Sequence, residues 1–150
     1  MCKTLTLDNQ NRVSKIVEEL LTRGVVDVNV KNSSGEPALL IAVKGDRLDP
    51  IEVLLSAEKV DDNAQYRHGM LPLTSAILSV NTDIVTRLLV ANEIDVTATS
   101  IAGRTPLKCA ALARWTSLVK LLLETCNVDV NVADKNGTTS IMISADPGDV

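Results

Sequence analysis

A period of 34 residues runs through the whole sequence and constrains its fold more than any other feature. Residues that stand 34 positions apart form columns, and several columns hold a single residue type. These are Gly35, Gly69, Gly103 and Gly137; Asp27, Asp61, Asp95 and Asp129; Leu20–Leu21, Leu54–Leu55, Leu88–Leu89 and Leu122–Leu123; Ala42, Ala76 and Ala110; and Leu5, Leu39, Leu73 and Leu107. Repetition at such a period is typical of a solenoid, in which each unit buries its apolar face against its neighbours.

The unit at residues 103–136 indicates what one repeat forms. Thr105 is a favourable N-cap and Pro106 a favourable first helical residue, so we expect a short helix here. We expect Thr116 or Ser117 to cap a second helix. Its apolar stripe consists of Leu118, Val119, Leu122 and Leu123. A hairpin-like loop with a glycine turn then closes the unit, so the predicted fold is an all-α stack of helix–turn–helix units.

This pattern resembles the ankyrin repeat. The family motif Gly-x-Thr-Pro-Leu is intact at residues 103–107, and the Asp-Val-Asn that follows the second helix stands at residues 27–29 and 129–131. The resemblance covers essentially the whole chain as a 34-residue variant, which implies about 4.4 repeats. It implies one ankyrin-repeat domain over residues 1–150, with an N-terminal cap at 1–34, units at 35–68, 69–102 and 103–136, and a partial unit at 137–150.

The repeats depart from the family pattern inside the array and at its ends. The histidine that usually follows the motif leucine is absent, and its column holds Leu40, Thr74, Lys108 and Met142. At the N-terminal end Asp8 stands in the alanine column, which thins the apolar face as expected of a capping unit. We expect at most one helix after Gly137. Because this would leave Met142 and Ile143 poorly covered, an array that continues in a longer protein is favoured over an unpaired cap.

Composition and charge exclude several classes of function. The 150 residues are 45% hydrophobic and 1% aromatic, and the net charge at pH 7 is −4. A negative chain with one Trp and one Tyr is not expected to bind nucleic acid, which needs positive charge and stacking platforms. No apolar run approaches the roughly 18–20 residues of a membrane span. Cys2, Cys109 and Cys126 follow no disulfide pattern, which predicts reduced thiols in a cytoplasmic protein, with the nucleus as the alternative.

Residues that carry catalysis or bind metal are scarce. His68 is the only histidine, and nothing in the register places a nucleophile beside it in its hairpin-tip loop. The cysteines lack metal-site spacing, and Cys109 and Cys126 are interpreted as small core residues. The aspartate column is expected to accept hydrogen bonds from loop backbone N–H groups. We therefore expect no enzyme, no metal and no cofactor.

The candidate binding site follows from the resemblance, because ankyrin-like stacks bind partners on a concave face of hairpin tips and first helices. Projected onto this sequence, that face gives Tyr66, Arg67, His68, Met70, Leu78, Ile101, Arg104, Leu112 and Trp115. Four of these are apolar where solvent exposure is expected, which is typical of an interaction patch, and the two arginines would flank it. Trp, Tyr and Arg are enriched at binding hot spots. For Trp115 an alternative stays open, namely that it covers the helix ends of the next repeat.

Three functions follow from these observations. The favoured one is a monomeric, non-catalytic module that holds another protein, as an extended segment or a protein face, across the second to fourth units. The alternative is a small-ligand or catalytic pocket in the same groove, which a deep closed pocket would favour. Its candidate acid–base groups are Glu36, Lys44, Asp46, His68, Arg104 and Lys108. The third is a structural spacer within a larger protein.

Overall fold

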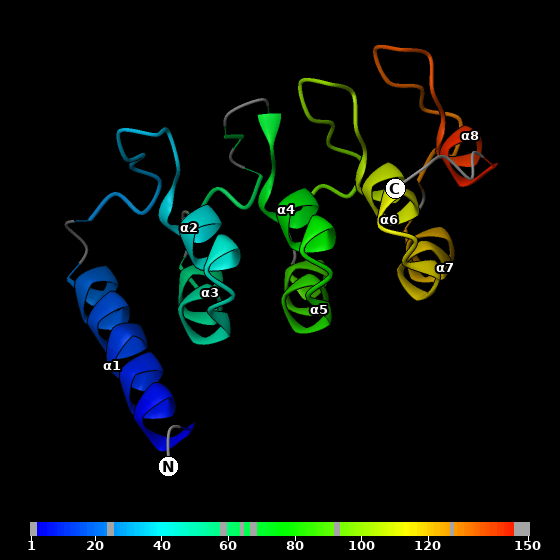
Figure 1. The fold of residues 1–150 in the computed structure, drawn as a ribbon. Coiled ribbons are helices and arrows are strands. Elements are labelled where there is room, and N and C mark those ends of the chain that lie inside the picture. The colour runs from blue at the N-terminus through cyan, green and yellow to red at the C-terminus, as the bar shows by residue number, and fades with distance from the viewer. Residues whose placement is uncertain are drawn as a thin grey trace.

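The computed structural model describes residues 3–23, 26–57, 60–63, 65–66, 69–91, 94–126 and 128–145, with the side chains of the first helix described from Arg12 onward. Within these ranges the chain forms eight helices that stack side by side, with hairpin loops projecting from one side (Figure 1). The helices are α1 (Lys3–Thr22), α2 (Ala38–Lys44), α3 (Leu48–Leu55), α4 (Pro72–Leu78), α5 (Thr82–Val90), α6 (Pro106–Leu112), α7 (Thr116–Thr125) and α8 (Ser140–Ala145). The predicted all-α architecture is confirmed. None of these helices is both long and apolar enough to cross a bilayer.

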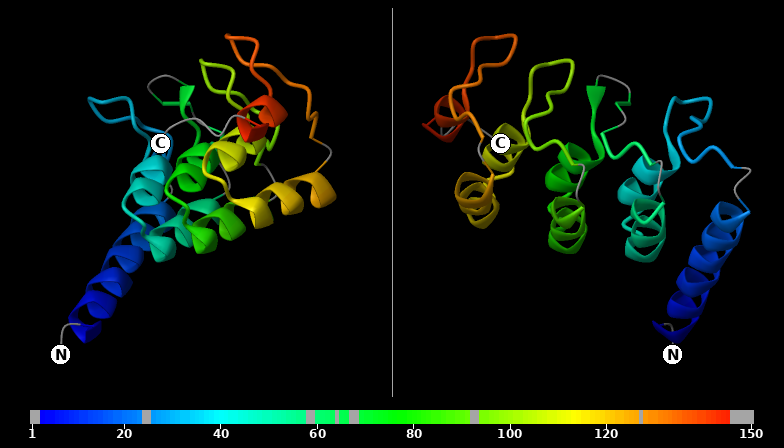
Figure 2. Two further views of the ribbon diagram at one scale, coloured as in Figure 1. Left: turned by 45° about the vertical axis from the view of Figure 1, so that its right-hand side comes forward. Right: turned by 180° about the vertical axis from the view of Figure 1, so that it is seen from behind.

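The helices lie in two layers, which the two views of Figure 2 separate. In one layer α2 contacts α4, α4 contacts α6, and α6 contacts α8. In the other layer α1 contacts α3 and α3 contacts α5. The layers are joined because α2 packs on α3, α4 on α5 and α6 on α7. Each helix pair thus buries its apolar face against the next pair, as expected of a solenoid.

The turn within each of these three helix pairs is built in the same way. The first helix ends with one residue in the left-handed region, at φ values of 53°, 54° and 53° for Asp46, Val80 and Arg114. The next backbone N–H donates to a carbonyl five residues back, in the alanine column. These hydrogen bonds run from Arg47 to Ala42 (3.0 Å), from Asn81 to Ala76 (3.3 Å) and from Trp115 to Ala110 (3.0 Å). This is the Schellman arrangement, which satisfies carbonyls at the helix end.

The first helix departs from this pattern. The helix–turn–helix expected for the first unit is wrong, because residues 3–22 form one continuous helix of 20 residues. Arg12 stands in the column of the left-handed turn residues, and Asp8 stands in the column that the other units bury as alanine. Burying a carboxylate between two helices costs free energy, so the sequence favours continuing the helix over folding it back.

The core is aliphatic and follows the interfaces between the helices. Its buried residues include Leu39, Val43, Ile51, Leu73, Ile77, Ile84, Leu88, Leu107, Leu118 and Leu122. The N-cap predicted at Thr105 is confirmed, since its Oγ1 accepts from the backbone N–H of Lys108 at 3.2 Å. The cap predicted at Thr116 or Ser117 is wrong, because α7 begins at Thr116 itself and its N-cap, Trp115, forms no side-chain cap.

Candidate functional site

The hairpin loops that carry the candidate residues are held by their own polar side chains. Asn32 Oδ1 accepts from the backbone N–H of Ser34 and of Glu36, at 2.9 Å each. The turn glycines have positive φ, as predicted, with values of 80°, 68°, 76° and 75° at Gly35, Gly69, Gly103 and Gly137. Isolated antiparallel bridges pair Lys31 with Pro37 and Tyr66 with Met70. These contacts give the loops the hairpin-like form that the sequence predicts.

Aspartate and asparagine side chains hold each loop and connect it to the next one. The Oδ1 atoms of Asp27, Asp61, Asp95 and Asp129 accept from the backbone N–H two residues further on, at 2.8–3.1 Å, which confirms the predicted role. An asparagine two residues after the aspartate then binds the loop of the next repeat. Asn29 Oδ1 accepts from the N–H of Asp61 at 2.8 Å, and Asn63 Oδ1 accepts from the N–H of Asp95 at 2.9 Å. The loops are therefore fixed to one another as well as to their own helices.

The hairpin tips also approach closely at the turn glycines. A β-carbon added to Gly69 would lie 2.8 Å from Cγ1 of Ile101 and closer still to its backbone nitrogen. A β-carbon on Gly103 would lie 3.0 Å from Cα of Asp134. At Gly69 only glycine allows the next hairpin to come so near, and at Gly103 a side chain would be tightly packed, so these two glycines fix the spacing of the tips as well as the turn.

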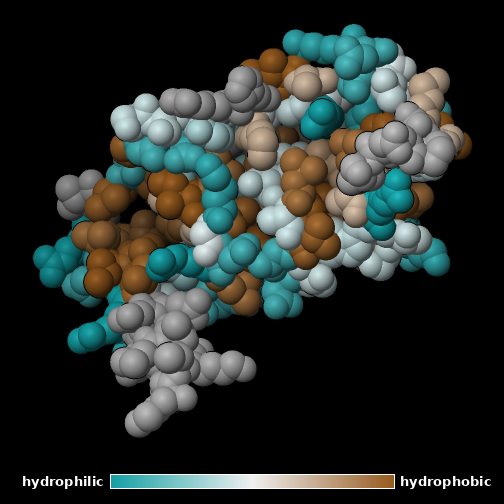
Figure 3. Space-filling model, in the orientation of Figure 1, coloured by the Kyte–Doolittle hydropathy of each residue, from teal (hydrophilic) through white to brown (hydrophobic). Residues whose placement is uncertain are grey.

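The apolar candidates lie on adjacent repeats and are exposed. Leu78 ends α4 and Leu112 ends α6, two helices in contact, and each leucine is 41% exposed. Ile101 is exposed at the tip of the hairpin that precedes α6. In the space-filling view a hydrophobic band covers the C-terminal end of α4 (Figure 3). The structure therefore places three of the four predicted apolar residues at the surface, whereas Met70 is half-buried.

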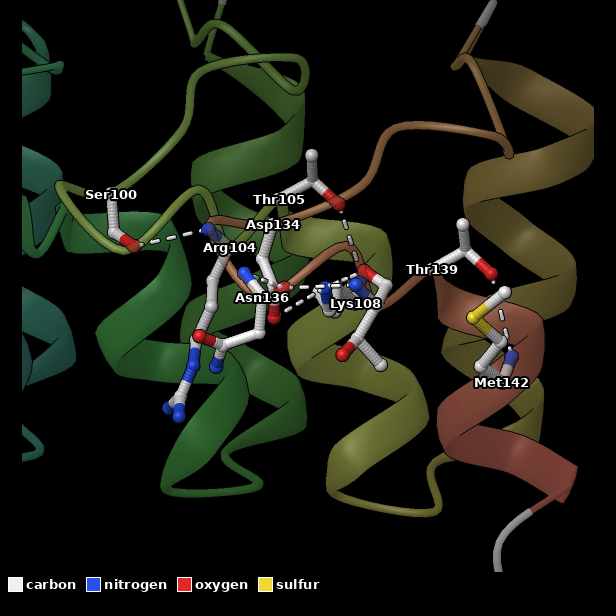
Figure 4. Close-up of polar contacts among 9 residues, drawn as sticks. Ser100, Arg104, Thr105, Lys108, Asp134, Asn136, Thr139 and Met142 are labelled. Carbon is white, nitrogen blue, oxygen red and sulfur yellow. Dashed lines mark hydrogen bonds and ion pairs between the residues drawn. The ribbon is translucent and has the colours of Figure 1, made fainter.

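The remaining candidates have different surroundings. Arg104 is exposed, and its guanidinium forms no hydrogen bond with another described residue (Figure 4). Trp115 is half-buried and packs against the core. Arg67, His68 and Cys2 lie outside the described residues. Among the described residues, no cluster of His, Cys, Asp or Glu could hold a metal ion.

Tyr66 belongs to a polar cluster that sequence reasoning did not assemble. Lys44 Nζ lies 2.6 Å from Glu36 Oε1 and 5.2 Å from the centre of the Tyr66 ring. Asn32 Nδ2 donates to Glu36 Oε2 at 3.1 Å. The hydrogen bond from Lys44, followed by that from Asn32, lowers the pKa of Glu36, and the same carboxylate raises the pKa of Lys44. Residues from three segments meet here, so no local pattern predicts the contact.

Two candidate acid–base groups of the alternative pocket, Lys108 and Asp46, are engaged in structural contacts. Lys108 is 1% exposed, its Nζ lies 2.7 Å from Asp134 Oδ2, and it donates to the backbone carbonyl of Thr138 (Figure 4). Hydrogen bonding from Lys108 and from the backbone of Thr138 lowers the pKa of Asp134 to about 2. Asp46 Oδ1 accepts from Asn81 Nδ2 at 3.1 Å. Lys108 thus holds the hairpin that precedes α8, and Asp46 holds the residue that precedes α5.

The comparison with protein families agrees with this geometry. The family model described as "Ankyrin repeats (3 copies)" matches residues 7–100 and 81–150. No curated protein sequence matches the chain significantly. The matched ranges include the paired helices, the turn glycines and the aspartate column. The chain therefore belongs to the ankyrin-repeat family.

Proposed function

We propose that this chain is a non-catalytic scaffold that binds another protein on the candidate surface formed by its first helices and hairpin tips. Ankyrin-repeat domains are in general protein–protein interaction modules. The proposed site comprises Tyr66, Arg67, His68, Met70, Leu78, Ile101, Arg104, Leu112 and Trp115, spread over three neighbouring repeats. We expect the protein to act in the cytoplasm or the nucleus, where its thiols stay reduced.

The observation that carries the proposal is the exposure of three apolar residues, Leu78, Leu112 and Ile101, on adjacent repeats. Leu78 and Leu112 are each 41% exposed and Ile101 is 56% exposed. Burying a fully exposed side chain of this kind contributes roughly 1.5–3 kcal/mol, and burying only its exposed part contributes a corresponding fraction. Exposed apolar residues that recur on neighbouring repeats favour an interaction site.

The charge of Arg104, close in sequence to Ile101, indicates what kind of partner would bind this surface. Arg104 is exposed and does not pair with another described residue, so its guanidinium is available to a carboxylate. The fitting partner is therefore a segment with apolar side chains and an acidic neighbour. Because the loops are fixed to one another by the aspartate and asparagine hydrogen bonds, little order has to be gained on binding.

An affinity purification from native lysate, followed by mass spectrometry, tests the proposal. The bait is compared with a Leu78→Glu, Ile101→Glu, Leu112→Glu variant and with a matched Val90→Glu control. Val90 is an exposed apolar residue on α5, outside the candidate surface. Unchanged circular dichroism melts must first show that both variants are folded.

The expected result is a protein that the wild type and the Val90→Glu control recover and the triple variant does not. Calorimetry with that purified partner should then show affinity weakened by at least about 30-fold for the triple variant, as expected when hot-spot residues are removed. Equal affinity for all three baits would reject the candidate surface.

A further inference from the structure

The outer side of α1 exposes residues that the other repeats bury. Ile16 is 60% exposed and Leu20 is 48% exposed. In the column of Leu20, the residues Leu54, Leu88 and Leu122 are buried, because in each of those repeats the first helix packs over the second. Since α1 is continuous, no first helix formed by the described residues lies over Ile16 and Leu20.

The side of α2 that faces α1 is exposed for the same reason. Ala38 and Ile41 are exposed, whereas Pro72 and Cys109, which stand in their columns, are buried. In those later repeats the preceding first helix covers them, through the α2–α4 and α4–α6 contacts. We name Ile16, Leu20, Ala38 and Ile41 the N-terminal groove. In the space-filling view hydrophobic residues surround a hollow between α1 and α2 (Figure 3).

The opposite end of the stack presents the complementary element. Figures 1 and 2 place α1 and α8 at the two ends. α8 packs on α6, yet Ile141 is 75% exposed and Met142 is exposed as well. In the column of Ile141, the residues Leu39, Leu73 and Leu107 are buried in the repeats where a second helix packs against the first. α8 is thus a first helix with an apolar side that no second helix covers among the described residues.

We propose that the chain binds a second copy of itself head to tail, with α8 of one copy in the N-terminal groove of the next. α8 then serves as the first helix, and residues 12–22 of the second copy's α1 serve as the second helix, of one composite repeat. The N-terminal half of α1 does not block the groove, because it projects past the ends of α3 and α5 (Figure 1). This surface is separate from the candidate surface of the proposed function.

The charges at the junction agree with this register. Between α3 and α5, Glu52 and Arg87 form an ion pair across two repeats, 35 residues apart. Lys120 stands in the column of Glu52, and Glu19 stands in the column of Arg87. If the 34-residue register continues across the junction, Lys120 of one copy therefore faces Glu19 of the next as Glu52 faces Arg87. Both side chains are exposed and their charges are opposite, as in the observed pair. Within one copy Glu19 Oε1 accepts from Arg23 of α1, so Lys120 would join this exposed pair.

The chain's own N-terminal residues are a poorer occupant of the groove than α8. At the position where each first helix comes closest to its neighbours, the array has Ala42, Ala76 and Ala110, all buried. Ser144 of α8 stands in this column and is small and uncharged, whereas Asp8 of the chain's own N-terminal segment carries a charge. Burial in the groove therefore favours α8 over a folded-back segment at residues 3–10.

Analytical ultracentrifugation of the full chain over a concentration series tests the proposal. Because a head-to-tail contact does not close on itself, the mean mass should rise steadily above 16.1 kDa with concentration. Leu20→Glu blocks the groove and Ile141→Glu blocks α8, so each variant alone should stay at the monomer mass. Val90→Glu, at neither end, should assemble as the wild type does.

A mixture of the two end-blocked variants gives the sharpest result. The Leu20→Glu variant keeps an intact α8, and the Ile141→Glu variant keeps an intact groove. The mixture should therefore form a dimer of twice the chain mass and nothing larger. A constant mass of 16.1 kDa for the wild type would agree with the monomer expected from the sequence and would overturn the proposal. A dimer lost in Leu20→Glu but kept in Ile141→Glu would also overturn it, because α8 would then take no part. Circular dichroism melts check that each variant is folded.

Discussion

Lys108 Nζ lies 2.7 Å from Asp134 Oδ2 and joins α6 to the hairpin that precedes α8. The lysine is buried and the aspartate nearly so, and the same ammonium donates to the carbonyl of Thr138. Lys108 stands in the column where the family usually has histidine. In that column Leu40 is buried in the core, and Thr74 Oγ1 accepts from the backbone N–H of Leu71 at 3.1 Å. In the described repeats this one column is thus accommodated in three ways: by burial in the core, by a local hydrogen bond at the helix start, and by an ion pair with the following hairpin.

Removing one charge of this ion pair should lower the stability of the protein more than removing both charges. Asp134→Asn keeps the acceptor for the loop N–H groups but leaves the Lys108 charge buried without its partner, so we expect Tm to fall by about 5 °C or more. The double variant Lys108→Met, Asp134→Asn should recover a large part of that loss, because no charge is then buried. Thermal melts of Asp134→Asn, of Lys108→Met and of the double variant measure the difference. A double variant as unstable as Asp134→Asn would contradict the prediction.

The stability that this pair contributes should depend on pH in the acid range. Hydrogen bonding from Lys108 lowers the pKa of Asp134 from its ordinary value of 3.8 to about 2. A lowered folded-state pKa means that the contribution is present above pH 4 and is lost as the pH falls from about 4 to about 2. Urea unfolding of the wild type and of Asp134→Asn should therefore show a stability difference that shrinks over this window. A difference that is the same at pH 7 and pH 2.5 would count against it.

Two turn glycines should differ in their tolerance of a methyl group. Gly137 has a φ of 75° with nothing within 4 Å of an added β-carbon, so Gly137→Ala should cost only the left-handed strain, about 1–2 kcal/mol. Gly69 has a φ of 68°, and its β-carbon would press on Ile101, so Gly69→Ala should cost about 1–3 kcal/mol more. Urea unfolding of the two variants makes the comparison. Equal losses would show that the hairpin tips do not need this close approach.

The cysteines should differ in reactivity. Cys109 is buried, and burial raises the pKa of its thiol to about 11, so at pH 8 only about one thiol in a thousand is ionised. Cys126 is half-buried at the end of α7. Iodoacetamide should therefore alkylate Cys126 at least about tenfold faster than Cys109 in the native protein. Mass spectrometry of the peptides measures both rates, and urea should equalise them. Equal rates in the native protein would refute the burial of Cys109.

The features that could be predicted from the sequence are those that recur at each repeat. The 34-residue columns predicted the helix pairs, the positive φ of the turn glycines, and the role of Asp27 and its equivalents as acceptors of loop N–H groups. Each of these depends on contacts within a few residues of the chain, or on a position that recurs in the same surroundings. Leu78, Ile101 and Leu112 were expected at the surface for the same reason, although their role in binding stays a prediction.

Only the tertiary structure decided the features that depend on a particular neighbour. The continuity of α1 follows from what it would have to bury if it folded back, and this continuity is what leaves Ile16 and Leu20 exposed. The Lys108–Asp134 pair joins a first helix to the hairpin that follows its repeat, and the Glu36–Lys44–Tyr66 cluster joins α2 to two successive hairpins; the register aligns these residues but does not pair them. A period determines which residues share a column. Which side chains meet across two columns is determined by side-chain length, charge and the space between helices, and these differ from one repeat to the next.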